Sequence, residues 1–386
     1  MNFMVWILLI LCLIYIYFQF KRFSFIKNKK KPYNYLVPLA MCLPFIIVAI
    51  FYLWGVAIFV VHLMLFYMIA NLIVRIKNKG KIIYANVLNG IVLGFTAVIM
   101  SIALFVLSLH IFETKYDLKT DKTDESLRIA QITDVHLGCT LDGKSFSKRL
   151  SDIEKTNPDL LVIVGDFVDD ETKKSDMIGA CKALGNFKTK YGVFFILGNH
   201  DKGYYNSNYR GFSLDDLYDE LLKNNVIILH DEVYNLTENY VLVGRYDRSF
   251  EGRMEALELT KNISKDKYII MLDHQPNDYA NEKDMADLVL SGHTHGGNLF
   301  PINFIVMASN DQTYGIKTID STTFIVSSGI SQWAIPYNTC IFNEYVLILL
   351  INSFFLLKNF LYLIFLFESS VFFNSNNDFF LPAKSL

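Results

Sequence analysis

The sequence is short of charge, of cysteine and of any excess of basic residues. Only 19% of its 386 residues are Asp, Glu, Lys or Arg, whereas 52% are hydrophobic, which is a low charged fraction for a purely soluble protein. The formal net charge of −2 supplies no basic face to displace counterions, which argues against a nucleic-acid binder. The five cysteines show no paired spacing, so no disulfide framework is expected. No repeat of solenoid period is visible.

The apolar residues are concentrated before residue 112 and again after residue 344. A bilayer core needs about 20 mostly apolar residues in a helix. Four candidate spans meet this requirement: near residues 3–20, 36–54, 56–74 and 87–111. The second and third are predicted to form a helical hairpin with a tight turn at Gly55. The first lacks the basic start and the cleavage site of a signal peptide.

Basic residues in two short loops predict the orientation of these spans. The loops read KRFSFIKNKKKPYN, after the first span, and RIKNKGK, after the third. Short loops rich in Lys and Arg stay in the cytoplasm. We therefore expect a multi-pass protein of the cell membrane, in which the chain leaves the bilayer on the outside after residue 112 and the remaining domain is extracytoplasmic.

Beyond the spans, the pattern predicts a polar linker over residues 113–127, an α/β domain over residues 128–352 and a hydrophobic tail over residues 353–386. In the domain, short apolar runs alternate with amphipathic stretches, as in α/β folds. Near the C-terminus, Tyr345–Phe367 could be a fifth span. A closing strand at Tyr345–Ile351 followed by a segment on the membrane surface is the interpretation that we favour.

Small groups of polar residues follow five of the predicted strands. The groups are Asp134 and His136; Asp166 and Asp169; Asn199, His200 and Asp201; His274; and His293 and His295. Ligands of α/β sheets collect beyond the carboxyl ends of strands, so these groups should meet in one crevice. Each motif alone is a weak signal, and the ordered set is a strong one.

The stretch SGHTHGGN, residues 291–298, is interpreted as a metal-binding loop. In an extended segment His293 and His295 would point the same way, and Gly292 would allow the backbone to approach an ion closely. A donor set of carboxylates, an amide and imidazoles without thiolate suits Mn, Fe, Zn or Co. Seven candidate ligands are more than one ion takes, which favours two divalent ions.

In order, DVH, GDFVD, GNHD, the histidine of HQP and GHTHGG resemble the signature of the calcineurin-like metallophosphoesterases, and membrane-anchored bacterial members in particular. The resemblance covers about residues 128–351. It implies a four-layer αββα sandwich of two mixed sheets with a dinuclear site. It also implies these roles: Asp134, His136 and His295 on the first metal, Asp166 as the bridge, Asn199, His274 and His293 on the second metal, His200 as catalytic histidine, and Asp169 as the carboxylate that orients it.

The implied activity is hydrolysis of a phosphomonoester or phosphodiester by hydroxide that bridges the two ions, in a chain anchored to the membrane. The substrate could derive from lipid or from the cell envelope, and a nucleotide is also compatible. The alternative is a catalytically silent, membrane-tethered sensor domain that binds metal. Tyr204, Tyr205, Tyr209 and Arg210 either line the substrate cleft, with Arg210 on a phosphate oxygen, or belong to a solvated loop.

Overall fold

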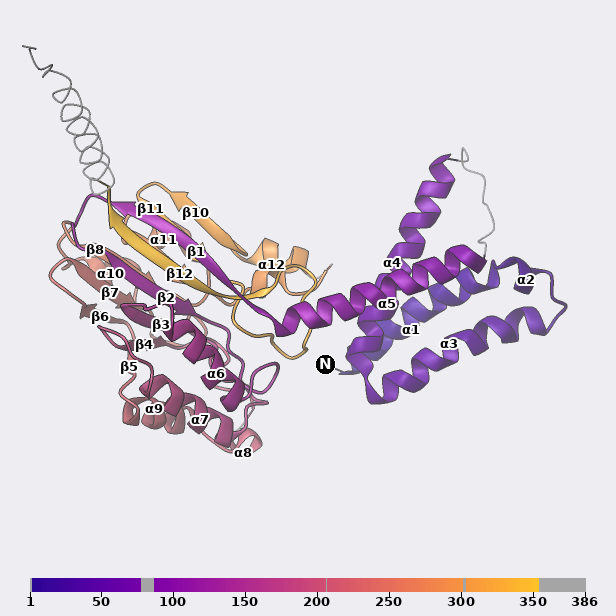
Figure 1. Cartoon of the computed structure of the whole chain (residues 1–386), viewed down its shortest axis with the longest axis horizontal. Coiled ribbons are helices and arrows are strands. Elements are labelled where there is room, and N and C mark those ends of the chain that lie inside the picture. Colours follow the sequence, from indigo (N-terminus) through magenta and orange to yellow (C-terminus); the bar gives the residue numbers. More distant parts are fainter. Residues whose placement is uncertain (1, 78–86, 206, 301–302, 354–386) are drawn as a thin grey trace, which may run out of the picture. The chain divides into compact units, whose positions relative to one another are not determined.

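The computed structural model describes residues 2–77, 87–205, 207–300 and 303–353, and Figure 1 shows their helices and strands. The chain divides into two compact units, residues 1–107 and 108–386. The first unit is helical. The second contains all the polar motifs that the sequence analysis singled out.

The first unit is built from apolar helices. They are α1 (Asn2–Lys21), the short α2 (Ser24–Lys27), α3 (Tyr33–Phe51), α4 (Leu53–Lys77) and most of α5 (Val87–Leu109). Among the described residues α1, α3 and α4 are long and apolar enough to cross a membrane, whereas the apolar stretch recorded in α5 is the shorter Leu93–Leu109. The predicted turn at Gly55 is wrong: the break is at Tyr52, and Gly55 lies inside α4.

The second unit contains two six-stranded sheets. The first has the order β1 (Ile111–Thr120), β12 (Asn343–Asn352), β2 (Leu127–Ile132), β3 (Leu160–Val164), β4 (Val193–Ile196) and β5 (Ile227–Ile228). The second has the order β10 (Gly315–Ile319), β11 (Thr322–Val326), β9 (Leu288–Ser291), β8 (Tyr268–Leu272), β7 (Tyr240–Gly244) and β6 (Glu232–Asn235). Both sheets mix parallel and antiparallel pairs.

Successive side chains of each strand point to opposite faces of its sheet, and this alternation separates the layers of the domain. In β3, Leu160 and Val162 face a core shared with β8 and β9, whereas Leu161 and Ile163 face the opposite way. That opposite face packs against α6 (Gly143–Glu154), α7 (Lys174–Gly185) and α9 (Leu214–Lys223). The outer face of the second sheet is covered by α10 (Ala256–Thr260) and α11 (Tyr279–Glu282). The predicted αββα sandwich is confirmed.

The predicted linker over residues 113–127 is wrong in its first half. Residues 111–120 form β1, which pairs in parallel with the whole of β12. Its side chains alternate between exposed and partly buried positions, as in an edge strand with one face in water, and its charged residues conceal this alternation in the sequence. Asn343–Asn352 form a strand and not a span. The predicted tail beyond residue 353 lies outside the described residues.

Parallel strands bring the motifs together. β2, β3 and β4 run parallel in the first sheet, and β7, β8 and β9 run parallel in the second. The segments that follow β2, β3, β4, β8 and β9 therefore emerge at the carboxyl ends of their strands, where α/β sheets collect ligands.

Candidate metal centre

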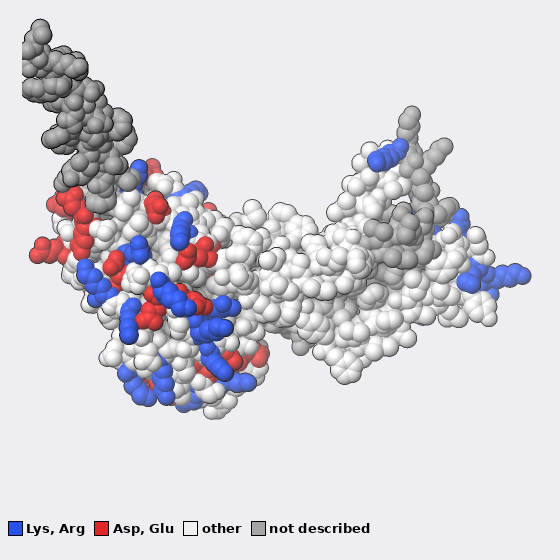
Figure 2. All heavy atoms as spheres, in the orientation of Figure 1, with Lys and Arg blue, Asp and Glu red and all other residues white. Residues whose placement is uncertain are grey.

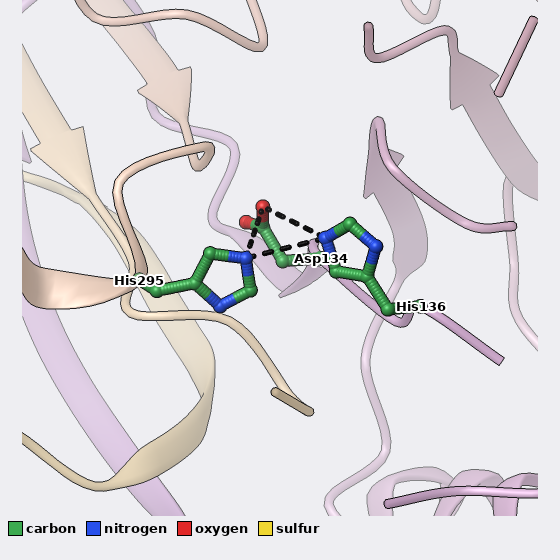
Figure 3. Close-up of side chains that lie close together, drawn as sticks. All are labelled: Asp134, His136 and His295. Carbon is green, nitrogen blue, oxygen red and sulfur yellow. Dashed lines mark hydrogen bonds and ion pairs between the residues drawn. The ribbon is translucent and has the colours of Figure 1, made fainter. Parts of the chain in front are cut away.

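A first group of three side chains joins the two sheets. Asp134 and His136 follow β2, and His295 lies in the short 3-10 helix η1 (His295–Gly297) after β9. Their side chains point toward one another in Figure 3. The Nε2 atoms of His136 and His295 are 3.2 Å apart, and the His295 Nε2 lies 3.5 Å from an oxygen of Asp134. Carboxylate and imidazole donors that converge in this way can hold one cation.

A second group consists of Asp166, His274 and His293, whose candidate ligand atoms also converge within 4.8 Å of one another. The Oδ2 atom of Asp166 lies 3.1 Å from Nε2 of His274 and 3.6 Å from Nε2 of His136, which belongs to the first group. One carboxylate oxygen therefore lies between the two groups. This is the position that a carboxylate shared by two ions would occupy.

The chemistry of these donors fits a pair of divalent cations. Two ligands on one tetrahedral ion, each about 2.1 Å from it, lie about 3.4 Å apart, close to the separations found here. Asn199 Oδ1 and His293 Nδ1 are buried without a hydrogen-bond partner among the described residues. Such orphaned polar atoms are costly unless something else satisfies them, and a cation does so.

The backbone at the site is strained. Five of the seven predicted ligands have φ between 39° and 71°: Asp134, His136, Asp166, His293 and His295. Residues with side chains adopt this left-handed region at a cost of order 1 kcal/mol or more each. Strain of this kind persists where the surrounding structure enforces it, which is typical of functional sites. The segment from 293 to 297 is therefore not extended, contrary to the expectation that His293 and His295 share one direction.

Two glycines allow the main chain to approach the carboxylates. A Cβ atom on Gly292 would lie 2.0 Å from the Thr133 hydroxyl and 2.4 Å from an oxygen of Asp134. One on Gly198 would lie 2.2 Å from an oxygen of Asp166. Any side chain at these positions would push a predicted ligand away.

Neighbouring groups orient the ligands. The Nδ1 atom of His274 lies 2.8 Å from the Val164 carbonyl, which leaves Nε2 facing Asp166. The Nδ1 atom of His136 lies 3.3 Å from Asp169 Oδ2. Of the contacts recorded for the described residues, the ion pair of Asp169 is with His136 and not with His200. Asp169 therefore supports His136, and its predicted orientation of His200 stays a prediction.

Asp201, whose role the sequence leaves open, clamps the backbone beneath the site. Its carboxylate is fully buried and accepts hydrogen bonds from four main-chain N–H groups: those of Asp166, Phe167, Val168 and Gly198, at 2.7–3.0 Å. Burial and the Asp166 carboxylate raise the pKa of Asp201 to about 7, whereas the N–H donors act to lower it. Asp201 thus holds the loops after β3 and β4 in one arrangement.

His200 lies at the edge of the two groups. Its ring centroid is 5.0 Å from that of His136, 4.9 Å from Tyr204 and 5.2 Å from Trp333. Its main-chain N–H donates to Asp166 at 2.7 Å, which ties its position to the shared carboxylate. Tyr204 accepts a hydrogen bond from the Asn199 amide at 2.7 Å. Sequence reasoning missed Trp333, because nothing near it in the chain carries a motif.

Burial keeps two of the ligand imidazoles neutral. It lowers the pKa of His295 to about 4 and also lowers that of His293. At His274 burial again opposes the charged form, but the Asp166 carboxylate prevails and raises the pKa well above its usual value. Without a cation, therefore, the Asp166 carboxylate stabilises the charged form of His274.

Two arginines near the site are occupied elsewhere. Arg210 is buried and donates to the main-chain carbonyls of Asp201 and Phe212, so the predicted phosphate contact is not supported. Arg245 is 1% exposed and pairs with three carboxylates, those of Asp273, Asp278 and Glu282. Asp273, Asp278 and Glu282 form a third cluster of carboxylates, but their charge is balanced by arginine. This cluster therefore does not resemble the two candidate ligand groups, which contain histidine.

Comparisons with known proteins agree with this geometry. Residues 127–297 match the family model of the calcineurin-like phosphoesterases. A metallophosphoesterase of Campylobacter jejuni is 33% identical over 226 residues, 56% of this chain and 57% of that protein. A zebrafish (Danio rerio) transmembrane protein with a metallophosphoesterase domain is 30% identical over 239 residues, 57% of this chain and 53% of that protein.

The match to these two relatives therefore spans little more than half of their length. A metallophosphoesterase of Aquifex aeolicus is 32% identical over 234 residues, which cover 58% of this chain and 85% of that protein. The matched region contains β2 to β9 and all seven candidate ligands. The chain therefore belongs to the calcineurin-like metallophosphoesterase family.

Proposed function

We propose that this protein is a membrane-anchored hydrolase of phosphoesters that uses two divalent cations. The observation that carries the proposal is the Asp166 carboxylate, one oxygen of which lies 3.1 Å from His274 and 3.6 Å from His136. Asp134 and His295 would complete one ligand set with His136. Asn199 and His293 would complete the other with His274. The donor types suit Mn, Fe, Zn or Co.

The chemistry divides between the ions and the chain. Bound divalent cations would lower the pKa of water and neutralise the charge of the phosphoryl group. His200, the histidine at the edge of the ligand groups, would donate a proton or a hydrogen bond to the leaving oxygen. Burial lowers the pKa of His200, so it binds protons weakly until a phosphoryl group brings negative charge beside it. Asp169 would orient His136, and Asp201 would hold the Asp166 loop.

The anchoring supports a substrate at the membrane. α1, α3 and α4 have the length and composition of membrane spans. The loops after α1 and after α4 are rich in Lys and Arg, which favours a cytoplasmic position for both loops. With the predicted fourth span near residues 87–111 added to these three spans, we infer a multi-pass arrangement with the catalytic unit outside the cytoplasm. A phosphoester of the membrane or the envelope would then be within reach.

Metal content and turnover test the proposal together. Full-length protein in detergent, dialysed against Mn²⁺ and freed of excess, should retain about two ions per chain. It should hydrolyse bis(p-nitrophenyl) phosphate or p-nitrophenyl phosphate. Asp166→Asn should lose both properties, whereas Asp320→Asn, an exposed carboxylate far from the ligands in the fold, should keep them. Metal binding without turnover would instead support the silent sensor.

A further inference from the structure

One end of the second unit presents an apolar helix to its surroundings. All seven residues of α12 (Asn303–Ser309) are described and none is buried; Phe304, Ile305 and Met307 are 59%, 70% and 54% exposed. The sequence around it contains no Asp, Glu, Lys or Arg over residues 292–310 and 321–343. Figure 2 shows charged side chains over the body of this unit and white surface around α12. An exposed apolar surface of this kind marks an interaction site.

This apolar helix is attached to the candidate metal centre. α12 packs on η1, the 3-10 helix that contains His295. The loop 333–342 continues the contact: the Asn338 amide donates to the His295 carbonyl at 2.9 Å, and the Thr339 hydroxyl accepts from the N–H of Phe300 at 2.7 Å. At its start the same loop contains Trp333, which is 39% exposed and contacts His200. We call α12, Phe300 and the loop 333–342 the apolar rim.

The rim also contacts the residue at which the second unit begins, directly after the part of α5 that belongs to the first unit. α5 ends at Leu109, and β1 begins at Ile111, so a single residue separates them. The Ser108 hydroxyl donates to the Pro336 carbonyl at 2.7 Å, and the Asn343 amide donates to the Ser108 carbonyl at 2.6 Å. Phe342, 44% exposed, lies 4.7 Å from Phe112 between ring centroids. The rim therefore contacts Ser108, the residue at which the second unit begins.

We propose that the apolar rim inserts into the outer layer of the bilayer and admits a membrane lipid whose phosphoester is hydrolysed at the metal centre. The proposal rests on the function proposed above and on α5 crossing the membrane. α5 has no charged residue, and if it crosses the bilayer its end would mark the boundary of the hydrocarbon. Aromatic residues such as Phe342 and Trp333 are expected at that boundary, and a short apolar helix beside it lies among acyl chains.

A lipid occupant explains these features better than a partner protein. The covalent link to α5 keeps the rim at the bilayer whether or not a partner is present. Stable protein interfaces usually carry several polar contacts among the apolar ones. α12 instead offers Phe304, Ile305 and Met307 without a charged neighbour. Phosphate in the head group would lie at the depth of His200 and Trp333 while the acyl chains stay with α12.

The first experiment measures membrane contact without using activity. A spin label is placed on Ile305→Cys in full-length protein that also carries Cys340→Ser, reconstituted in phosphatidylglycerol vesicles. The matched control is Leu257→Cys on α10, which is 57% exposed and outside the rim. We expect the label at 305 to be accessible to oxygen and shielded from a water-soluble nickel complex. The label at 257 should show the reverse, and a water-exposed label at 305 would overturn the proposal.

The second experiment measures substrate class. Full-length protein with Mn²⁺ in vesicles is assayed on phosphatidic acid and on the soluble p-nitrophenyl phosphate. Ile305→Glu should lower the ratio of lipid to soluble hydrolysis by about tenfold or more, because a carboxylate disfavours insertion. Leu257→Glu should leave the ratio unchanged. An unchanged ratio in Ile305→Glu, or hydrolysis of the soluble ester alone, would refute the lipid substrate.

These outcomes separate the two proposals. If the wild-type protein hydrolyses no phosphoester at all, the proposed function fails and the lipid substrate falls with it. The depth of the label at 305 then still decides whether the rim inserts in the membrane. If the soluble ester is hydrolysed and the label lies in water, the proposed function stands and the further inference is wrong.

Discussion

Replacing Asp201 by Asn should damage both stability and the metal centre. The carboxylate accepts four main-chain hydrogen bonds, two on each oxygen. Asn keeps one accepting oxygen, so two buried N–H groups would face an amide NH₂. Each lost hydrogen bond to a charged acceptor costs about 1.5–3 kcal/mol. Removing a buried charge beside Asp166 returns part of this, which leaves a net loss of about 2–4 kcal/mol.

Thermal unfolding of the full-length protein in detergent, followed by circular dichroism, measures this loss. For a unit of this size 1 kcal/mol shifts the melting temperature by about 2–4 °C, so we expect a fall of roughly 5–15 °C. Asp320→Asn, on the surface, should change stability by about 0.5 kcal/mol or less. Manganese binding should weaken by about tenfold or more, since Asp166 loses its support. If Asp201→Asn melts at the same temperature as Asp320→Asn and binds manganese normally, the hydrogen bonds to Asp201 are not what holds the Asp166 loop.

Three further predictions follow from the same geometry. His200→Ala should keep its metal content and lose about 10²–10⁴-fold in turnover number; full activity would exclude a proton-donor role. The Asp166 carboxylate raises the pKa of His274 in the metal-free protein, so cation binding should displace a proton. Metal affinity should therefore rise with pH, and titration calorimetry in two buffers of different ionisation enthalpy should detect the release. Arg245→Met leaves the buried Glu282 without its arginine partner and leaves Asp273 and Asp278 with Arg253 alone, so it should cost about 3–5 kcal/mol in chemical denaturation. The exposed Lys283→Met should cost about 1 kcal/mol or less.

Much of the fold and the donor chemistry could be predicted from sequence, because both depend on local pattern. Apolar runs such as Leu160–Val164 are strands in any context that buries both faces, and polar groups directly after such strands must lie at the sheet edge. The types of ligand, carboxylate, amide and imidazole, restrict the metals before any distance is known. The αββα layers and the family follow from these two facts.

What the sequence alone could not supply is the partner of each polar group. Asp169 is separated from His136 and from His200 by similar lengths of chain, and only the packing of the β2 and β3 loops selects His136. Asp201 finds its donors in a different loop. β1 is a strand only because β12 returns to pair with it, which its alternating charges conceal.

The sequence by itself determined the elements, the ligand types and the likeness to a family, since these depend on residue type and spacing. The tertiary structure alone decided the shared position of Asp166, the clamp of Asp201 and the contacts of the apolar rim with Ser108 and His295. Hydrogen bonds and ion pairs act over about 3 Å. Contacts of that range between distant segments are set by how strands pair and layers pack, and no local pattern encodes them.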